Sequence, residues 1–211
     1  MTAEIVELIT HRQSSPTRVN GQTPPPRQRN ADVRPREYLL PDEIERLLKA
    51  TKMSKRHGHR DYTIALLGFR HGLRVSELAS LRWDMVDLKQ AVLHVTRLKN
   101  GVPSNHPIRG PELRALRALK RRYPGQYLFS TDRGGPIASA TIRKIIAKAG
   151  ELAEIPFRVH PHMLRHSTGY HLANKGFDAR AIQSYLGHRC IEHTVRYTEL
   201  SSDRFNRFWD D

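Results

Sequence analysis

Apolar residues recur at helical spacing along most of the chain from Tyr38 onward. Residues three and four positions apart lie on one face of an α-helix, so each such run predicts a helix with one buried side. The predicted helices begin near Pro41 and Asp61 and continue in the runs 76–81, 111–122, 139–149, 161–175, 179–186 and 191–197.

Particular residues mark where several of these helices begin and end. Pro41 suits the first helical position, where its missing N–H would have no partner in any case. Ser139 and Asp178 carry side chains that cap a first turn, and we expect each to precede a helix. Gly72 and Gly187 follow apolar runs and predict helix ends, because glycine readily adopts the left-handed conformation found there.

Strand patterns are confined to two short regions of the chain. Residues 91–98 alternate and are rich in β-branched side chains, and the following pair Asn100-Gly101 favours a two-residue hairpin turn. The returning run 102–108 contains two prolines, so we expect an edge strand. Residues 127–129 form a further short strand candidate. The prediction is a mainly α fold with a small antiparallel β-sheet, an α+β arrangement.

Residues 1–36 have a different character from the rest of the chain. They contain three consecutive prolines and six arginines against three acidic residues, and apolar periodicity ends after Ile9. Such a segment buries too little surface to offset its ordering entropy. We expect a flexible basic arm over 1–36, which is either a solvated tail or a segment that orders along DNA phosphates. The structured domain is expected over 37–211.

The charge of the chain predicts a polyanionic partner. Lysine and arginine outnumber acidic residues 36 to 21, giving a formal net charge of +15 and a sequence pI near 10.5. Charge alone leaves DNA, RNA and a membrane surface open. The single cysteine, Cys190, rules out an internal disulfide, and no apolar run is long enough to span a membrane or to resemble a signal peptide. We therefore expect a soluble cytoplasmic protein.

The end of the chain carries residues suited to cleaving a phosphodiester without a metal. Arg74 and Arg165 can each donate two hydrogen bonds to phosphate oxygens. His162 and His188 can donate to the same phosphate or transfer a proton. Tyr197 can act as the nucleophile, but an ordinary tyrosine pKa of about 10 requires activation by a base or by positive surroundings.

Taken singly, these residues have simpler explanations. Tyr197 could be a core aromatic residue with a satisfied hydroxyl, and Glu77 could be a helix residue paired with Arg74. His188, Cys190 and His193 suggest zinc, but no second Cys/His pair accompanies them, and we expect neither a metal nor a cofactor. Order and spacing of the whole set carry the hypothesis.

Three motifs resemble those of the tyrosine site-specific recombinases, also called the phage-integrase family. HGLRVSEL resembles that family's first arginine box, HPHMLRHSTGYHLANKG its His-x-x-Arg box, and YLGHRCIEHTVRYTEL its closing box. The likeness runs from about Tyr38 to Asp211, and it is greatest to the short recombinases that invert the fimbrial phase-variation switch. It implies the catalytic-domain fold of that family.

The resemblance also implies a role for each matching residue. Arg74 and Arg165 would clamp the scissile phosphate, with Glu77 supporting Arg74 from behind. Tyr197 would be the nucleophile that forms a 3′-phosphotyrosine and releases a 5′-hydroxyl. Lys99, expected near the hairpin tip, would match the catalytic lysine.

Two histidines would complete the catalytic set. His162 would assist proton transfer, and His188 would match the later His/Trp position of the family. His160 and His166 match no catalytic position, so we interpret them as structural.

The implied activity is site-specific recombination of double-stranded DNA by inversion, integration or excision, performed by four protomers on two paired sites. Most family members carry an N-terminal core-binding domain that has no counterpart before Tyr38. This leaves open how DNA is gripped and whether an accessory DNA-bending protein takes part. Action on DNA implies association with the nucleoid, and the aromatic residues Phe205, Phe208 and Trp209 could dock on a neighbouring protomer or on their own core.

Three other activities remain as alternatives. A type IB topoisomerase would use the same site chemistry to nick and reseal one strand. A non-catalytic DNA-binding regulator, or an excision factor, would keep the fold with a decayed site, although every catalytic position holds a competent residue. An RNA-binding protein would explain the charge but not the spacing of the motifs.

Overall fold

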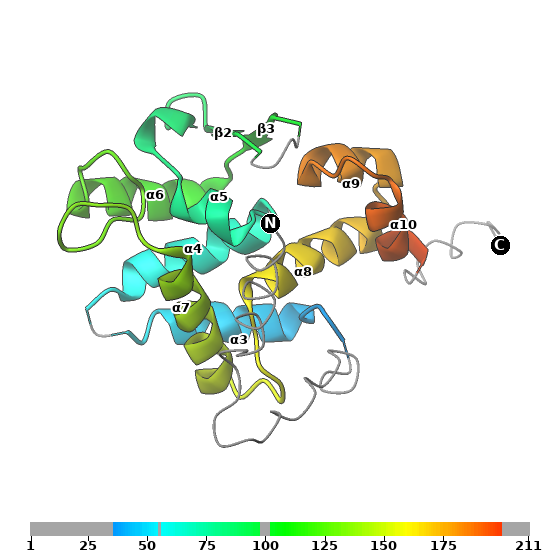
Figure 1. The fold of residues 1–211 in the computed structure, drawn as a ribbon, viewed down its shortest axis with the longest axis horizontal. Helices are drawn as coiled ribbons and strands as arrows, with labels where there is room; N and C mark the ends of the chain where they lie inside the picture. The colour runs from blue at the N-terminus through cyan, green and yellow to red at the C-terminus, as the bar shows by residue number, and fades with distance from the viewer. Residues whose placement is uncertain (1–35, 55, 98–101, 200–211) are drawn as a thin grey trace, which may run out of the picture. The chain divides into compact units, whose positions relative to one another are not determined.

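Two helices, α4 (Gly58–Arg70) and α8 (Pro161–Asn174), pack against each other in the middle of the fold (Figure 1). The structure is a computed structural model, and it describes residues 36–54, 56–97 and 102–199. α4 begins three residues before the predicted Asp61, and its inward face includes Ala65 and Leu66 as expected. Both helices are buried on several sides, so they form the frame on which the other elements pack.

The other described helices surround this pair. They are α3 (Pro41–Thr51), α5 (Val75–Ala79), α6 (Gly110–Arg122), α7 (Ser139–Leu152), α9 (Ala179–Leu186) and α10 (Glu192–Glu199), with a short 3₁₀ turn η2 (Trp83–Met85). α3 and α6 pack on α4, whereas α9 and α10 pack on α8 and on each other. The helices that the apolar spacing predicts are therefore confirmed, most of them within three residues at each end.

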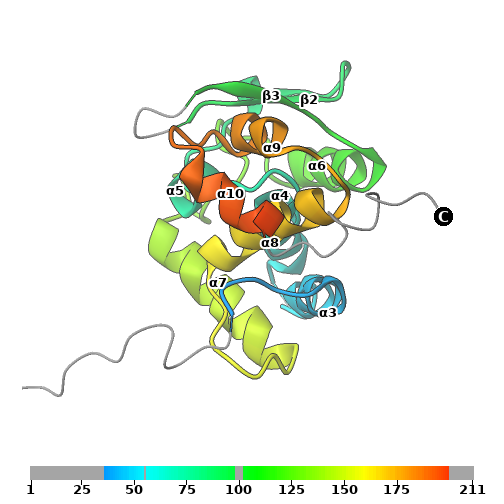
Figure 2. The same cartoon turned by 90° about the vertical axis from the view of Figure 1, so that its right-hand side faces the viewer.

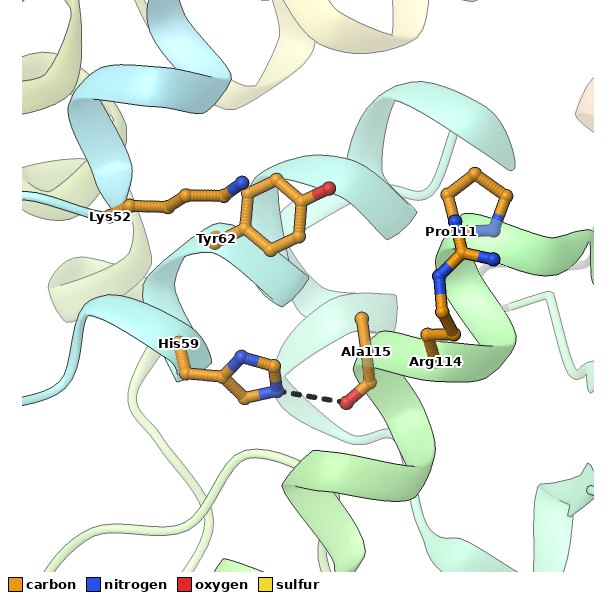
Figure 3. A pocket seen from close by; sticks show the side chains of 6 residues that line it. All are labelled: Lys52, His59, Tyr62, Pro111, Arg114 and Ala115. Atoms are coloured by element: carbon orange, nitrogen blue, oxygen red, sulfur yellow. Dashed lines mark hydrogen bonds between the residues drawn. The ribbon is translucent and has the colours of Figure 1, made fainter.

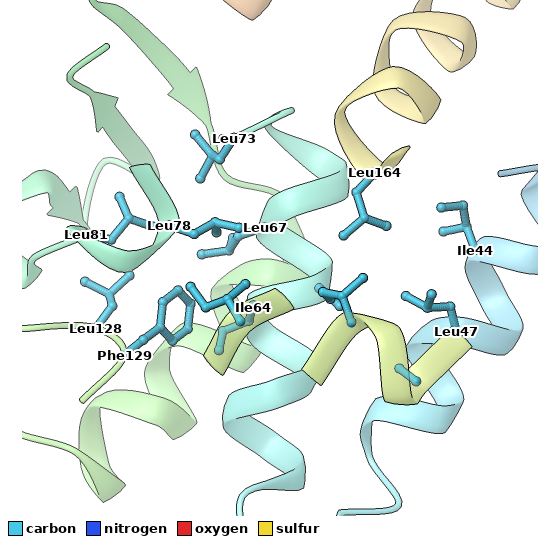
Figure 4. Packing of buried hydrophobic residues seen from close by; sticks show 14 of the residues in the cluster. Ile44, Leu47, Ile64, Leu67, Leu73, Leu78, Leu81, Leu128, Phe129 and Leu164 are labelled. Carbon is cyan, nitrogen blue, oxygen red and sulfur yellow. The ribbon is translucent and has the colours of Figure 1, made fainter. Parts of the chain in front are cut away.

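The main core lies between α3, α4, α5 and α8 (Figure 4). Leu47, Ile64, Leu67 and Leu164 are fully buried there, and Phe129 enters from the segment before α7. Burying one such side chain contributes about 1.5–3 kcal/mol to stability. A smaller cluster around Ala173, Ile182, Leu186 and Tyr197 joins α8, α9 and α10.

A three-stranded antiparallel sheet lies beside α9 (Figure 2). Its strands β1 (Val86–Asp87), β2 (Val92–Val95) and β3 (Ser104–Pro107) follow one another in that order, and Leu93 pairs with His106. β3 is an edge strand, as its prolines predict. The predicted Asn100-Gly101 turn lies outside the described residues.

Three details of the prediction are wrong. Residues 127–129 form no strand, because Tyr127 makes only a single isolated bridge with Arg82. Ser139 is the first helical residue of α7, and Ala138 occupies the capping position. The strand expected from residue 91 begins at Val92, because Ala91 has a left-handed backbone with φ 55°.

The ends of α9 follow the prediction closely. The Asp178 side chain accepts hydrogen bonds from the backbone N–H groups of Arg180 and Ala181, which caps the first turn. Gly187 ends the helix with φ 66°, in the left-handed region. Gly72, after α4, has φ 57°. Both glycines therefore turn the chain immediately before a segment with a predicted site residue.

Most of the predicted arm and the aromatic C-terminal residues 205–209 lie outside the described residues. Arg36 is the exception, because its guanidinium donates to both Glu43 carboxylate oxygens at 2.6 Å. This last residue of the predicted arm is therefore tied to α3. No helix in the described part of the chain is long and apolar enough to cross a membrane.

Candidate active site

Arg74 is held at the start of α5 by the carboxylate of Glu77. Its guanidinium Nη1 donates to Glu77 Oε1 at 2.8 Å, and its backbone N–H donates to Glu77 Oε2 at 2.8 Å. The Glu77 side chain is 1% exposed, whereas that of Arg74 is 28% exposed. A buried carboxylate thus fixes one edge of a cation whose other edge still reaches solvent. This is consistent with a supporting role for Glu77.

Arg165 lies on α8, and its side chain is buried. Its Nη1 donates to the Gly72 carbonyl at 2.5 Å and its Nη2 donates to the Leu186 carbonyl at 2.7 Å. Burial, together with the nearby positive charge of Arg74, lowers the pKa of Arg165 to about 9. The guanidinium remains charged at pH 7. It joins the turn before α5 to the end of α9.

Tyr197 lies on α10 with its ring packed against α8. It is 1% exposed, and its hydroxyl is 2.8 Å from Nδ1 of His166. A Cβ placed on Gly169 would be 2.6 Å from the tyrosine ring, so α8 accommodates the ring only where it lacks a side chain. Arg196 Nη2 also donates to the hydroxyl at 3.4 Å. Within the described residues, neither Arg74 nor Arg165 contacts this hydroxyl.

His166 presents a neutral imidazole to the tyrosine. Burial, together with the neighbouring His162 and Arg196, lowers the pKa of His166 to about 3. The His162 and His166 rings meet edge to face with centroids 4.6 Å apart. His166 therefore contacts the candidate nucleophile, although its sequence position suggests only a structural role.

His188 follows the end of α9 and faces the same region. Its Nδ1 is 2.8 Å from the Thr194 hydroxyl, and its ring stacks on Tyr197 with centroids 6.3 Å apart. Burial lowers the pKa of His188 to about 3, and the charges of Arg165 and Arg74 act in the same direction. Because both arginines disfavour the charged form of His188, this imidazole lies close to Arg165 and to Arg74.

Arg74 and His162 open into one cleft of about 570 Å³. The starts of α5, α7 and α8 meet there, and the lining residues are Arg74, Val75, Ser76, Ser139, Arg143, His160, Pro161 and His162. Two arginines, two histidines and two hydroxyl groups give the cleft the character of an anion site. Arg143 is a cation of this cleft that the sequence motifs do not mark.

The structure thus brings most of the predicted residues together. Arg74 is paired with Glu77, and it lies close enough to Arg165 to lower the pKa of that residue. The His188 ring stacks on Tyr197, whose hydroxyl is hydrogen-bonded to His166. The His162 ring meets that of His166. Lys99 lies outside the described residues. In the described part of the chain, no group of three or more His, Cys, Asp or Glu side chains is arranged to hold a metal ion, and Cys190 is exposed.

Besides Arg143, sequence reasoning missed His166 and Arg97 in this region. His162 and His166 are four residues apart on a helix, and this spacing places them on one face. Arg97 continues the alternation of Leu93 and Val95, which are buried. An arginine at an inward strand position signals a buried partner, and Arg97 Nη1 donates to Glu77 Oε2 at 2.9 Å.

A second pocket of about 480 Å³ lies elsewhere, beside α4 and α6 (Figure 3). Lys52 lies over the Tyr62 ring at 4.3 Å, and Nε2 of His59 donates to the Ala115 carbonyl at 2.9 Å. None of the predicted site residues lines this pocket. The candidate site is therefore the region around Arg74, Arg165 and Tyr197.

Comparisons with known proteins find relatives over most of the chain. The model of the phage integrase family matches residues 37–204. The type 1 fimbriae regulatory protein FimB of Escherichia coli K12 is 41% identical over 186 residues, covering 85% of this chain and 92% of FimB.

Solved structures share the fold. The XerA recombinase superimposes with a TM-score of 0.71 and 29% identity, over 80% of this chain and 62% of that one. A lambda integrase dimer bound to a COC′ core site gives a TM-score of 0.63 at 24% identity, over 82% of this chain and 50% of that one. The chain thus spans nearly the full length of FimB but only part of these two recombinases.

Proposed function

Because the chain belongs to the phage integrase family of tyrosine recombinases, we propose that Tyr197 is the nucleophile with which it cuts and rejoins DNA at specific sites. The observation that carries this proposal is the convergence of Arg74, Arg165, His188 and Tyr197 from segments far apart in the sequence. Arg74 lies close enough to Arg165 to disfavour its charged form, and a bound phosphate would relieve this repulsion.

The proposed chemistry proceeds through one covalent intermediate. The Tyr197 oxygen attacks the phosphorus atom, the bond from phosphorus to the 5′ oxygen breaks, and a 3′-phosphotyrosine forms. Arg74 and Arg165 neutralise the charge on the non-bridging oxygens. We assign the proton for the departing 5′ oxygen to Lys99. The reverse attack by the 5′-hydroxyl of a partner strand reseals the DNA, and because the phosphotyrosine conserves the bond energy, the scheme requires no ATP.

The two histidines predicted for the site act in the same step. We assign His188 a hydrogen bond to a non-bridging oxygen, which a neutral imidazole can donate through Nε2 while Nδ1 accepts from Thr194. His162 lines the cleft beside Arg74, and we assign to it the proton that the Tyr197 hydroxyl loses as its oxygen attacks.

The described conformation corresponds to a resting state in this proposal. Arg165 donates to two backbone carbonyls, and the Tyr197 hydroxyl is hydrogen-bonded to His166 inside the protein. A phosphate that enters the cleft competes for the arginine donors. Attack then requires the phenol to turn from His166 toward the phosphorus atom, and His166 serves as the positioning residue that holds the phenol beforehand.

Double-stranded DNA is the proposed partner, bound by four protomers on two paired sites. The net charge of +15 supports a DNA ligand, and residues 1–36 supply six arginines for phosphate contacts. The likeness to FimB favours inversion of a DNA segment, and we propose that an accessory DNA-bending protein takes part. Such a reaction takes place in the cytoplasm, at the nucleoid.

The test uses DNA that the protein selects for itself. Genomic fragments of the source organism that bind Tyr197→Phe are enriched and sequenced, and two copies are cloned in inverted orientation on a supercoiled plasmid. We expect the wild-type protein to invert the intervening segment and to leave a plasmid without sites supercoiled. Tyr197→Phe should invert nothing and should leave both plasmids supercoiled. Relaxation of the siteless plasmid would indicate a topoisomerase, and binding without any strand cleavage would indicate a regulator.

A further inference from the structure

Arg97 leaves the end of β2 and enters the interior between α5 and α9. It is 5% exposed, and it lies outside the first arginine box, the His-x-x-Arg box and the closing box. A buried arginine needs partners for its donors, because an unpaired buried charge destabilises a fold strongly. Arg97 donates to Glu77 and to the Tyr185 carbonyl, and both of these groups border the candidate active site.

One guanidinium nitrogen of Arg97 binds the carboxylate of Glu77, which also holds Arg74. Nη1 donates to Glu77 Oε2 at 2.9 Å, and the other oxygen of the same carboxylate accepts from Arg74 at 2.8 Å. Glu77 therefore lies between two guanidinium groups. The position of the Arg74 guanidinium depends on where Arg97 holds this carboxylate.

The second terminal nitrogen of the Arg97 guanidinium binds the end of α9, the helix that leads to His188. The last carbonyls of a helix lack partners within it. Backbone N–H groups of Gly187 and His188 satisfy Ser184 and Gln183, whereas the Tyr185 carbonyl accepts from Arg97 Nη2 at 2.5 Å.

Arg165 completes the end of this helix by donating to the next carbonyl, that of Leu186, at 2.7 Å. Two arginines thus hold the negative end of the α9 dipole, where cations are favoured. The backbone is closely fitted to Arg97, because a Cβ on Gly187 would be 2.7 Å from Arg97 Nε.

The arrangement of Arg97 is poorly suited to stability alone. Its Nε–H is buried and has no acceptor among the described residues. An unsatisfied buried donor destabilises a fold, and a buried ion pair commonly gives no more stability than apolar residues of the same volume. Its contacts instead bind two segments of the site at a fixed separation.

We propose that Arg97 is a positioning residue that sets the distance between Arg74 and His188. Its Nη1 binds Glu77, and its Nη2 binds the end of α9. The proposal rests on the function proposed above, in which Arg74 and His188 contact the scissile phosphate. Arg97 itself touches no DNA in this account. Its loss should therefore slow strand cleavage far more than it weakens DNA binding.

The test compares Arg97→Met and Arg97→Lys with a matched control, Arg60→Met. Arg60 is 7% exposed, donates to Asp61 at 3.1 Å and to the Ser130 carbonyl at 3.3 Å, and is outside the cleft. Each full-length variant is mixed with a nicked duplex of the selected site, and single-turnover adduct formation, DNA affinity and urea unfolding are measured.

We expect Arg97→Met to bind DNA within about threefold of wild type but to form the adduct about a hundredfold more slowly, because small misplacements of catalytic groups have effects of this size. Arg97→Lys keeps the charge beside Glu77 but has no fork to reach both partners, so its rate should be intermediate. Arg60→Met should lose stability while its adduct rate stays near that of wild type.

Three outcomes would overturn parts of the account in distinguishable ways. An Arg97→Met rate equal to that of Arg60→Met would reject the positioning role and leave the proposed function intact. Should Arg97→Met fail to fold, an Arg97→Lys rate equal to wild type would reject the role in the same way. Absence of any adduct with the wild-type protein would reject the proposed function and the role of Arg97 with it.

Discussion

A tyrosine hydroxyl buried against a neutral imidazole is the central contact at the scale of single residues. The Tyr197 hydroxyl lies 2.8 Å from His166 Nδ1. We predict that His166→Phe, which cannot accept the phenol proton, forms the covalent adduct about three- to tenfold more slowly, the equivalent of one hydrogen bond. His171→Phe, on the same helix beside Phe69, is the control. Unchanged adduct formation in His166→Phe would show that this contact is incidental.

Buried histidines make stability dependent on pH, and His106 and His166 are two of them. Burial lowers the pKa of His106 and of His166 to about 3, whereas both would titrate near 6.5 in the unfolded chain. Between these values the unfolded state binds more protons, so the free energy of unfolding falls as pH decreases below 6.5 and is fully retained above it. Each histidine contributes up to about 1.4 kcal/mol per pH unit.

Urea unfolding between pH 7 and pH 4.5 measures this dependence. His106→Gln should reduce the slope of unfolding free energy against pH, whereas His94→Gln, at an exposed position on β2, should leave it unchanged. Equal slopes for wild type and His106→Gln would contradict the prediction.

Some site residues could be found from the sequence and others could not, for physical reasons. The sequence motifs contain Arg74, Arg165, His188 and Tyr197. The order of these motifs along the chain matches that of one family, which makes the four residues recognisable. The hydrogen bond between His166 and Tyr197 joins residues 31 positions apart, and the apolar pattern carries no information on such contacts. Arg97 was detectable, since the alternation of β2 places it inward, but its partners depend on how α5 and α9 pack.

The end of α9 is the element on which the geometry of the site depends most. Gly187 adopts φ 66°, and a Cβ there would meet Arg97 at 2.7 Å. We predict that Gly187→Ala lowers both the free energy of unfolding and the adduct rate. The backbone cost is about 1–2 kcal/mol, and the displacement of Arg97 adds to it.

Gly134→Ala is the matched control for this substitution. Gly134 has φ 80°, and a Cβ there would meet nothing within 4 Å. It should therefore show the backbone cost alone, with an unchanged adduct rate, in urea unfolding and single-turnover assays. Equal losses of stability and of rate in the two variants would show that the contact of Gly187 with Arg97 has no consequence.

Elements were predictable where local sequence determines them. The cap at Asp178 and the left-handed glycine at 187 depend on side chains within a few residues, and both are confirmed. The segment 127–129 was misinterpreted because a short apolar run fits a buried loop as well as a strand. Leu128 and Phe129 enter the core there, and only Tyr127 forms a bridge.

At the scale of the whole molecule, a net charge of +15 should dominate DNA affinity. Neutralising six to ten phosphates lowers affinity by about 10³–10⁵-fold between 50 and 200 mM salt. We predict such a decrease for the full chain and a shallower dependence after removal of residues 1–35, measured by fluorescence anisotropy. The truncation stops before Arg36 because that residue binds Glu43. An unchanged salt dependence after truncation would exclude phosphate contacts by the removed arginines.

Covalent capture of the cleaved strand shows whether Tyr197 is the nucleophile. A nicked duplex of the selected site loses the short strand that bears the 5′-hydroxyl once cleavage occurs, so the phosphotyrosine cannot reverse. The account predicts an adduct that survives denaturation, with the nucleotide mapped by mass spectrometry to the peptide containing Tyr197, and no adduct with Tyr197→Phe. An adduct on any other residue, or an undiminished adduct with Tyr197→Phe, would contradict it.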